Sequence, residues 1–145
     1  MSSNTLPLHF SAHTIRGAGR GKNLNVPTIN LRLEDIPSSV EEGIYAGFVW
    51  FNARYKKQDT RNKKQIEMQR FCAAIHYGPR PVFHDDVAFE IHILDKEMKK
   101  LPESVTVQLI ERLRNVEDFA SPEELRVQMA EDIAEARAIL KPSPH

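Results

Sequence analysis

Cysteine is nearly absent from the sequence, because Cys72 is the one cysteine among 145 residues. A single cysteine cannot form a disulfide within the chain and cannot build a cysteine-rich metal site, so the sequence fits a reducing compartment. No apolar run approaches the roughly 18 residues that a membrane-spanning helix needs, and the first residues lack the basic-then-apolar order of a signal peptide. We therefore expect a cytoplasmic protein without a membrane partner.

Net charge is absent as well, since 20 basic residues balance 20 acidic ones. This balance gives no general attraction to nucleic acid or to an anionic membrane. Basic residues do gather locally, because residues 54–70 hold seven Lys and Arg against two acids, a local net of +5. Only Tyr55 lies nearby to stack on a base, so we favour a solvated excursion between strands, at 52–69, over a nucleic-acid site.

The first two thirds of the chain alternate between short apolar segments and turn residues. Strands are expected at residues 43–51, 70–77, 87–94 and 104–110, with weaker signals at 6–15 and 28–33. About six short, mostly antiparallel strands are typical of a small closed barrel. We therefore expect a mainly β fold that forms one domain over residues 1–145.

The last quarter of the chain predicts a helix over residues 121–140. Ser121 takes the N-cap position, Pro122 the first helical position and Glu124 the third, which is the order of a capping box. Apolar residues then recur at three- and four-residue spacing: Leu125, Met129, Ile133, Ala136 and Leu140. This apolar stripe should pack against the barrel.

The most unusual segment is a glycine-rich loop. Three of the six glycines alternate here with three cations: Arg16, Gly17, Gly19, Arg20, Gly21 and Lys22. Glycines let backbone N–H groups converge on an anion, and cations complete its neutralisation. The loop matches neither the Walker pattern nor the dinucleotide pattern, and taken alone it is equally compatible with a flexible turn.

Polar side chains follow this loop on a short strand. Thr28 and Asn30 place a hydroxyl and an amide oxygen on one face, two residues apart. Hard cations such as Mg²⁺ accept neutral oxygen ligands when substrate phosphates supply the negative charge. Glu90, an acid inside an apolar strand, is a candidate general base, whereas His92 on the same face is given no catalytic role. In isolation, the pair is also compatible with a turn, and Glu90 with an ordinary surface position.

These segments together resemble the motif series of the riboflavin kinase (flavokinase) family. The motifs stand in order: the glycine loop at 17–24, Pro-Thr-Ile-Asn at 27–30, Gly-Ile-Tyr-Ala-Gly at 43–47, Gly-Pro-Arg-Pro at 78–81, Phe-Glu-Ile-His-Ile-Leu-Asp at 89–95 and a strand-loop-helix segment from 112 to 137. The resemblance covers nearly the whole chain, from Phe10 to Leu140. A series of motifs in this order indicates a family far more specifically than any single motif does.

The resemblance implies a six-stranded antiparallel Greek-key barrel with a C-terminal α-helix. It also implies ATP- and Mg²⁺-dependent transfer of the γ-phosphoryl group to the 5′-hydroxyl of riboflavin, giving FMN and ADP. The nucleotide-binding residues would be Gly17, Gly19, Arg20, Gly21, Lys22, Thr28 and Asn30. Thr28 and Asn30 would also hold Mg²⁺, and Glu90 would be the general base. Arg114 and Phe119 would lie near the flavin.

The chain departs from the family pattern at several points. Asn25 stands where glycine is usual, Val82 where threonine is commoner, and residues 96–102 replace an acidic-aromatic turn. Because the kinase-like motifs begin almost at once, we expect a monofunctional kinase without an adenylyltransferase domain. We also expect a monomer. The alternative is a flavin- or nucleotide-binding module on the same barrel that has lost turnover.

Overall fold

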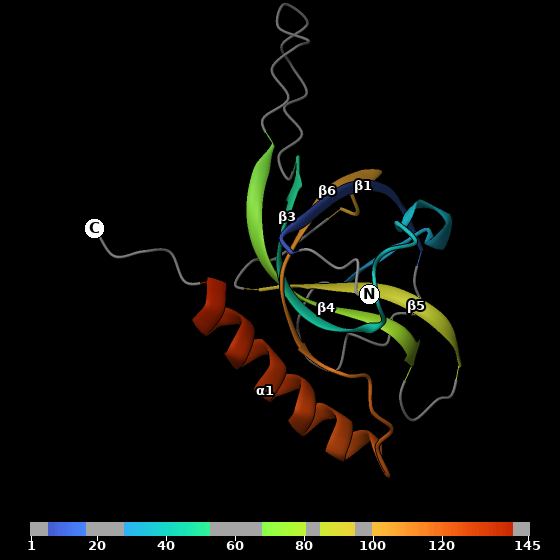
Figure 1. The fold of residues 1–145 in the computed structure, drawn as a ribbon, viewed down its shortest axis with the longest axis vertical. Coiled ribbons are helices and arrows are strands. Elements are labelled where there is room, and N and C mark those ends of the chain that lie inside the picture. Colours follow the sequence, from blue (N-terminus) through green and yellow to red (C-terminus); the bar gives the residue numbers. More distant parts are fainter. Residues whose placement is uncertain (1–5, 17–27, 53–67, 81–84, 95–99, 141–145) are drawn as a thin grey trace, which may run out of the picture.

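The computed structural model describes residues 6–16, 28–52, 68–80, 85–94 and 100–140, in which six strands precede a C-terminal helix (Figure 1). The strands are β1 (Leu8–Ile15), β2 (Thr28–Leu31), β3 (Gly43–Phe51), β4 (Gln69–Arg80), β5 (Asp85–Ile93) and β6 (Ser104–Arg114). The helix α1 spans Pro122–Leu140, and a short 3-10 helix occupies Leu33–Asp35. The predicted basic excursion falls between β3 and β4, and its residues 53–67 lie outside the described part.

The six strands form a closed barrel in the order β1-β2-β5-β4-β3-β6, and every pairing is antiparallel. Strands β3, β4 and β5 are successive neighbours, and β6 returns to pair with β3, which is the Greek-key arrangement. The predicted barrel fold is thus confirmed. Strands β4 and β6 run further than predicted, because pairing continues past their apolar stretches to Arg80 and Arg114.

The barrel interior is filled by alternate residues of the strands. Phe89, Ile91 and Ile93 of β5 are each at most 1% exposed, as the two-residue period predicts, and Glu90 projects from the opposite, outer face. Phe10 of β1 meets the ring of Phe89 edge to face, with centroids 5.7 Å apart. Burying one such large apolar side chain stabilises the fold by about 1.5–3 kcal/mol. This rigid interior fixes which side chains face outward.

Helix α1 lies along the outside of the barrel and packs against β3 and β4 (Figure 1). Ala46 and Ala74 on these strands are buried with Ala136 and Leu140 of the helix, since small side chains permit close approach. The Ser121 hydroxyl accepts a hydrogen bond from the Glu124 backbone N–H at 3.2 Å, which confirms the predicted N-cap. Among the described residues, none of the helices combines the length and the apolar composition of a membrane-spanning segment.

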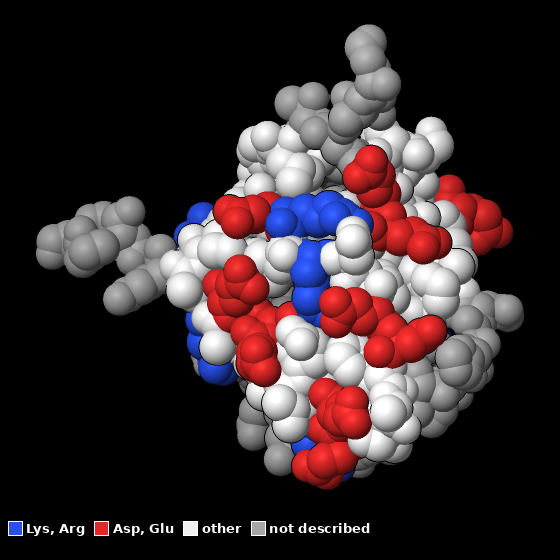
Figure 2. Space-filling model, turned by 60° about the horizontal axis from the view of Figure 1, so that its bottom comes forward, with Lys and Arg blue, Asp and Glu red and all other residues white. Residues whose placement is uncertain are grey.

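Charges of both signs share the surface. On the face shown in Figure 2, acidic side chains surround a short run of basic ones. This mixture agrees with the balanced composition of 20 basic and 20 acidic residues.

Candidate active site

Thr28, Asn30 and Glu90 meet on the outer face of the barrel, where β2 pairs with β5. In the antiparallel register, Asn30 lies opposite Glu90 and Thr28 lies opposite His92. Directly opposed residues project from the same face with Cβ atoms about 5 Å apart. The structure therefore brings together three of the predicted site residues, although about 60 positions separate the two segments in the sequence.

Asn30 is buried with an unsatisfied acceptor. The residue is 6% exposed, and its Oδ1 atom has no hydrogen-bond partner among the described residues. A buried acceptor without a donor costs about 1–3 kcal/mol, so this oxygen is a candidate ligand atom for a bound cation. An amide oxygen beside a threonine hydroxyl is a donor set that suits a hard cation. These residues thus fit the Mg²⁺ that the resemblance implies.

The side chain of His92 lies next to the Thr28 hydroxyl. The Thr28 Oγ1 atom is 3.4 Å from His92 Nδ1, and His92 is only 5% exposed. Burial lowers the pKa of His92, which favours the neutral ring, although the Glu90 carboxylate opposes this shift. Within the described part of the chain, His92 Nε2 has no hydrogen-bond partner. His92 therefore contacts the Thr28 hydroxyl. The position of His92 in the sequence did not predict this contact.

A second histidine, His76, lies opposite Glu90 on the neighbouring strand β4. It is 8% exposed, and its Nε2 atom is 3.2 Å from the Gly78 carbonyl oxygen and 3.1 Å from that of Pro79. Burial lowers the pKa of His76, and the Glu90 carboxylate partly offsets this effect. Sequence analysis missed His76, because the alternation along β4 does not say which residue of β5 it faces.

The predicted flavin residues Arg114 and Phe119 adjoin the connection from β6 to α1. Arg114 donates hydrogen bonds from Nε and Nη2 to the two carboxylate oxygens of Asp132, at 2.9 and 2.7 Å. Its Nη1 donates to the Asn115 carbonyl at 2.9 Å, and its guanidinium carbon lies 5.9 Å from the centroid of the Phe119 ring. Gln128 donates a further bond to Asp132 at 3.1 Å. The guanidinium is thus engaged within the protein.

Only the residues that flank the glycine loop belong to the described part of the structure. Gly17, Gly19, Arg20, Gly21 and Lys22 lie outside the described residues, as do Asn25, Val82 and residues 95–99. Strand β1 leads into this loop and β2 leaves it, and these strands pair so that Ile15 lies opposite Asn30. Ile15 and Thr28, described residues on the two sides of the loop, therefore lie next to Asn30 or opposite it.

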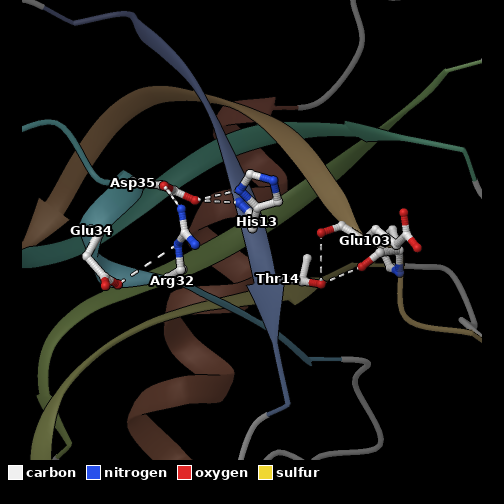
Figure 3. Close-up of polar contacts among 7 residues, drawn as sticks. His13, Thr14, Arg32, Glu34, Asp35 and Glu103 are labelled. Atoms are coloured by element: carbon white, nitrogen blue, oxygen red, sulfur yellow. Dashed lines mark hydrogen bonds and ion pairs between the residues drawn. The ribbon is translucent and has the colours of Figure 1, made fainter.

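A polar cluster fastens the chain just after β2 (Figure 3). The Asp35 carboxylate accepts hydrogen bonds from the His13 backbone N–H at 2.8 Å and from Arg32 Nη2 at 3.0 Å. The hydrogen bond from the His13 backbone, together with Arg32, lowers the pKa of Asp35 to about 2. Nearby, the Thr14 hydroxyl donates to the backbone carbonyls of Pro102 and Glu103. This cluster ties β1 to the segment that follows β2.

Comparison with known proteins places this barrel in a family. The family model described as Flavokinase, riboflavin kinase, matches residues 4–140, so the chain belongs to the riboflavin kinase family. The chain is 27% identical over 143 residues to the bifunctional riboflavin kinase/FMN adenylyltransferase of Pseudomonas fluorescens, covering 96% of this chain and 40% of that protein. It is 25% identical over 133 residues to the Haemophilus influenzae protein of the same name, covering 91% and 38%. The chain thus spans about two fifths of the length of these curated relatives.

Solved structures share the fold. A macrolide-efflux protein from Streptococcus pneumoniae superposes with a TM-score of 0.63 at 24% identity, covering 90% of this chain and 38% of that one. Riboflavin kinase from Trypanosoma brucei superposes with a TM-score of 0.52 at 17% identity, covering 97% and 84%. At these identities the likeness concerns the fold.

Proposed function

We propose that the protein transfers the γ-phosphoryl group of ATP to the 5′-hydroxyl of riboflavin, giving FMN and ADP. Family membership over residues 4–140 supports this reaction. The observation that carries it is the position of Asn30 directly opposite Glu90, with a buried Asn30 oxygen that has no hydrogen-bond partner among the described residues. A cation ligand and a carboxylate base on adjacent strands are what phosphoryl transfer to a hydroxyl requires.

The nucleotide is proposed to bind where β1, the glycine loop and β2 meet. Thr28 and Asn30 would hold Mg²⁺ through their side-chain oxygens, because both face outward beside the ends of the loop. The ion, when bound, neutralises charge on the phosphates. The loop residues Gly17, Gly19, Arg20, Gly21 and Lys22 are proposed to bind the phosphates through backbone N–H groups and cations.

Glu90 is proposed to act as the general base. Its carboxylate accepts the proton of the ribityl 5′-hydroxyl while that oxygen forms the new bond to the γ-phosphorus. The bond from phosphorus to the β,γ-bridging oxygen breaks, and its electron pair leaves with ADP. Because Glu90 faces Asn30 across one strand pairing, the hydroxyl and the phosphoryl group would be held next to each other.

The flavin is proposed to bind beside the connection from β6 to α1. Phe119 offers an aromatic ring there for contact with the flavin ring system. Arg114 is hydrogen-bonded to Asp132 and Asn115, so it would act by holding this connection in place. The proposed partners are thus riboflavin or FMN and ATP or ADP.

A cytoplasmic monomer is the proposed state of the protein. The single cysteine supports a reducing compartment, and the balanced charge gives no reason to expect a nucleic-acid partner.

Chromatographic assay of the protein with riboflavin and Mg·ATP tests this function. We expect FMN and ADP to appear in equal amounts, and both to disappear when a chelator removes Mg²⁺. If riboflavin and nucleotide bind without FMN formation, the proposal is wrong and the barrel is a binding module.

A further inference from the structure

Buried polar atoms without a hydrogen-bond partner gather where β2 pairs with β5. Among the described residues, three buried side-chain atoms lack such a partner: Asn30 Oδ1, His92 Nε2 and Arg112 Nε. Asn30 and His92 belong to successive outer-face pairs of this ladder, Asn30 with Glu90 and Thr28 with His92. A buried polar group of this kind destabilises the fold and points to a role in a site. Asn30 has a role in the proposed reaction, whereas His92 has none so far.

The side chains of His92 and Thr28 are joined by a hydrogen bond. Thr28 Oγ1 lies 3.4 Å from His92 Nδ1, and the two residues stand directly opposite each other. On its other side, His92 lies opposite Ala74 of β4, whose methyl group cannot form a hydrogen bond. Of the two residues directly opposite His92, Thr28 is therefore the one with a polar side chain.

The position of the ring proton decides what this hydrogen bond does for Thr28. His92 is only 5% exposed, which favours the neutral ring because a buried charge is costly. A neutral ring with its proton on Nδ1 would donate to Oγ1 and occupy one of the oxygen lone pairs. With the proton on Nε2, Nδ1 accepts the hydroxyl proton of Thr28 instead. Both lone pairs of Oγ1 then stay available, which suits an oxygen that binds a cation.

From this geometry we propose that His92 is a positioning residue for Thr28, one whose Nδ1 accepts the hydroxyl proton and leaves the Oγ1 lone pairs to the proposed Mg²⁺. Residues that hydrogen-bond to a metal ligand orient it, and their loss weakens metal affinity by about ten- to a hundredfold. The proposal rests on the phosphotransfer function proposed above, because it concerns the metal site of that reaction. His92 needs no contact with the substrates to act in this way.

Nitrogen NMR of the histidine rings tests the hydrogen bond without nucleotide or turnover. We expect the ring proton of His92 on Nε2 and an Nδ1 signal shifted by an accepted hydrogen bond. In Thr28→Val this shift should disappear, because the hydroxyl that donates the hydrogen bond is gone. A proton on Nδ1 in the wild type, or an Nδ1 signal that Thr28→Val leaves unchanged, would overturn the proposal.

Calorimetry with a non-hydrolysable ATP analogue tests the effect on the metal site. We expect His92→Leu to raise the Mg²⁺ concentration for half-maximal analogue binding by about ten- to a hundredfold. His92→Asn should recover part of this loss, because its amide oxygen can take the place of Nδ1 as the acceptor. A wild-type Mg²⁺ dependence in His92→Leu would overturn the proposal.

A double variant shows whether His92 acts through the Thr28 hydroxyl. If it does, His92→Leu added to Thr28→Val should weaken Mg²⁺-dependent binding little further, whereas full additivity of the two losses would overturn the proposal. The urea midpoint of His92→Leu should stay near that of the wild type, because Nε2 has no hydrogen-bond partner within the described part of the chain. Midpoints that fall in parallel with Mg²⁺ binding in both His92 variants would show a structural role instead and overturn the proposal.

Two comparisons keep the outcomes distinguishable. His9→Asn changes an exposed histidine on β1, beside Trp50, and should leave the Mg²⁺ dependence of analogue binding unchanged. A wild-type protein that binds the analogue with Mg²⁺ but makes no FMN would overturn the phosphotransfer function, while the His92 variants would still decide the role of His92. A protein that makes FMN and keeps its Mg²⁺ dependence in His92→Leu would overturn the His92 proposal alone.

Discussion

Arg114 at the end of β6 and Asp132 in the middle of α1 form a two-point ion pair, with N–O distances of 2.9 and 2.7 Å. Their side chains are 18% and 7% exposed, so the pair is largely out of water. The Asp132 carboxylate also accepts the Gln128 amide, which satisfies more of its lone pairs. This pair fastens the helix to the barrel beside the proposed flavin site.

Removal of one partner should therefore destabilise the fold. Asp132→Ala leaves the Arg114 charge buried without its carboxylate, and we expect the free energy of unfolding to fall by about 3–5 kcal/mol. Urea denaturation measures this loss. Glu131→Ala, an exposed neighbour on the same helix, is the matched control and should change stability little.

A double variant distinguishes the stability lost with the ion pair from the cost of leaving one charge buried without its partner. Arg114→Met combined with Asp132→Leu removes both charges, and its loss should be smaller than that of Asp132→Ala. Equal losses in the two proteins would show that this pair is not the source of the effect.

Features set by local sequence were predicted well. The helix start follows from Ser121 and Glu124, which need only each other to form the cap. The outward position of Glu90 follows from the alternation along β5, because a buried barrel face enforces the two-residue period. The barrel itself was indicated by the number and kind of strands, and its Greek-key order by the family resemblance.

Features set by register could not be predicted from local patterns. His76 lies opposite Glu90 only because of how β4 and β5 pair, and that register is interrupted between Pro79 and Arg80. The Arg114 and Asp132 pair joins two elements whose distance apart depends on the packing of α1. The meeting of Asn30 with Glu90 was implied by the resemblance, and periodicity alone would not have found it.

Asn30 is expected to contribute to ligand binding without contributing to the stability of the fold. Asn30→Leu removes a buried acceptor that has no donor within the described part of the chain, so the free energy of unfolding should stay the same or rise by up to about 1 kcal/mol. The same change should abolish Mg²⁺-dependent binding of a non-hydrolysable ATP analogue, measured by calorimetry. A variant that still binds the analogue in a Mg²⁺-dependent manner would exclude Asn30 from the metal site.

Asn30→Asp is the matched variant for this test, because it keeps an oxygen ligand at the same position. It also buries a carboxylate, which destabilises the fold unless a cation neutralises it. We expect Mg²⁺ to raise the Tm of Asn30→Asp more than that of the wild type. An equal response to Mg²⁺ would contradict a cation site at this atom.

Asp35 should make stability depend on pH in the acid range. Its folded-state pKa is about 2 against an ordinary value of 3.8, chiefly because it accepts the His13 backbone hydrogen bond. A lowered acid pKa stabilises the fold above pH of about 4, and this contribution is lost as pH falls toward about 2. Urea midpoints of the wild type and Asp35→Asn should therefore differ at neutral pH and converge across this window.

Glu34→Gln serves as the control for this pH dependence. Glu34 is highly exposed and lies 4.0 Å from Arg32, so the substitution should change the urea midpoints little. If the gap between the wild type and Asp35→Asn stays constant from neutral pH down to about pH 2, the hydrogen bonds of Asp35 do not lower its pKa.

The most direct test of the account is single-turnover FMN formation by the wild type and by Glu90→Gln, with riboflavin and Mg·ATP saturating. Glutamine keeps the size of the side chain but cannot accept the proton, so the rate should fall by about two to four orders of magnitude. Affinities for riboflavin and for an ATP analogue should stay nearly unchanged, since the substitution leaves the rest of the site in place. FMN formation at the wild-type rate by Glu90→Gln would contradict the account, because the carboxylate opposite Asn30 would then not be the base.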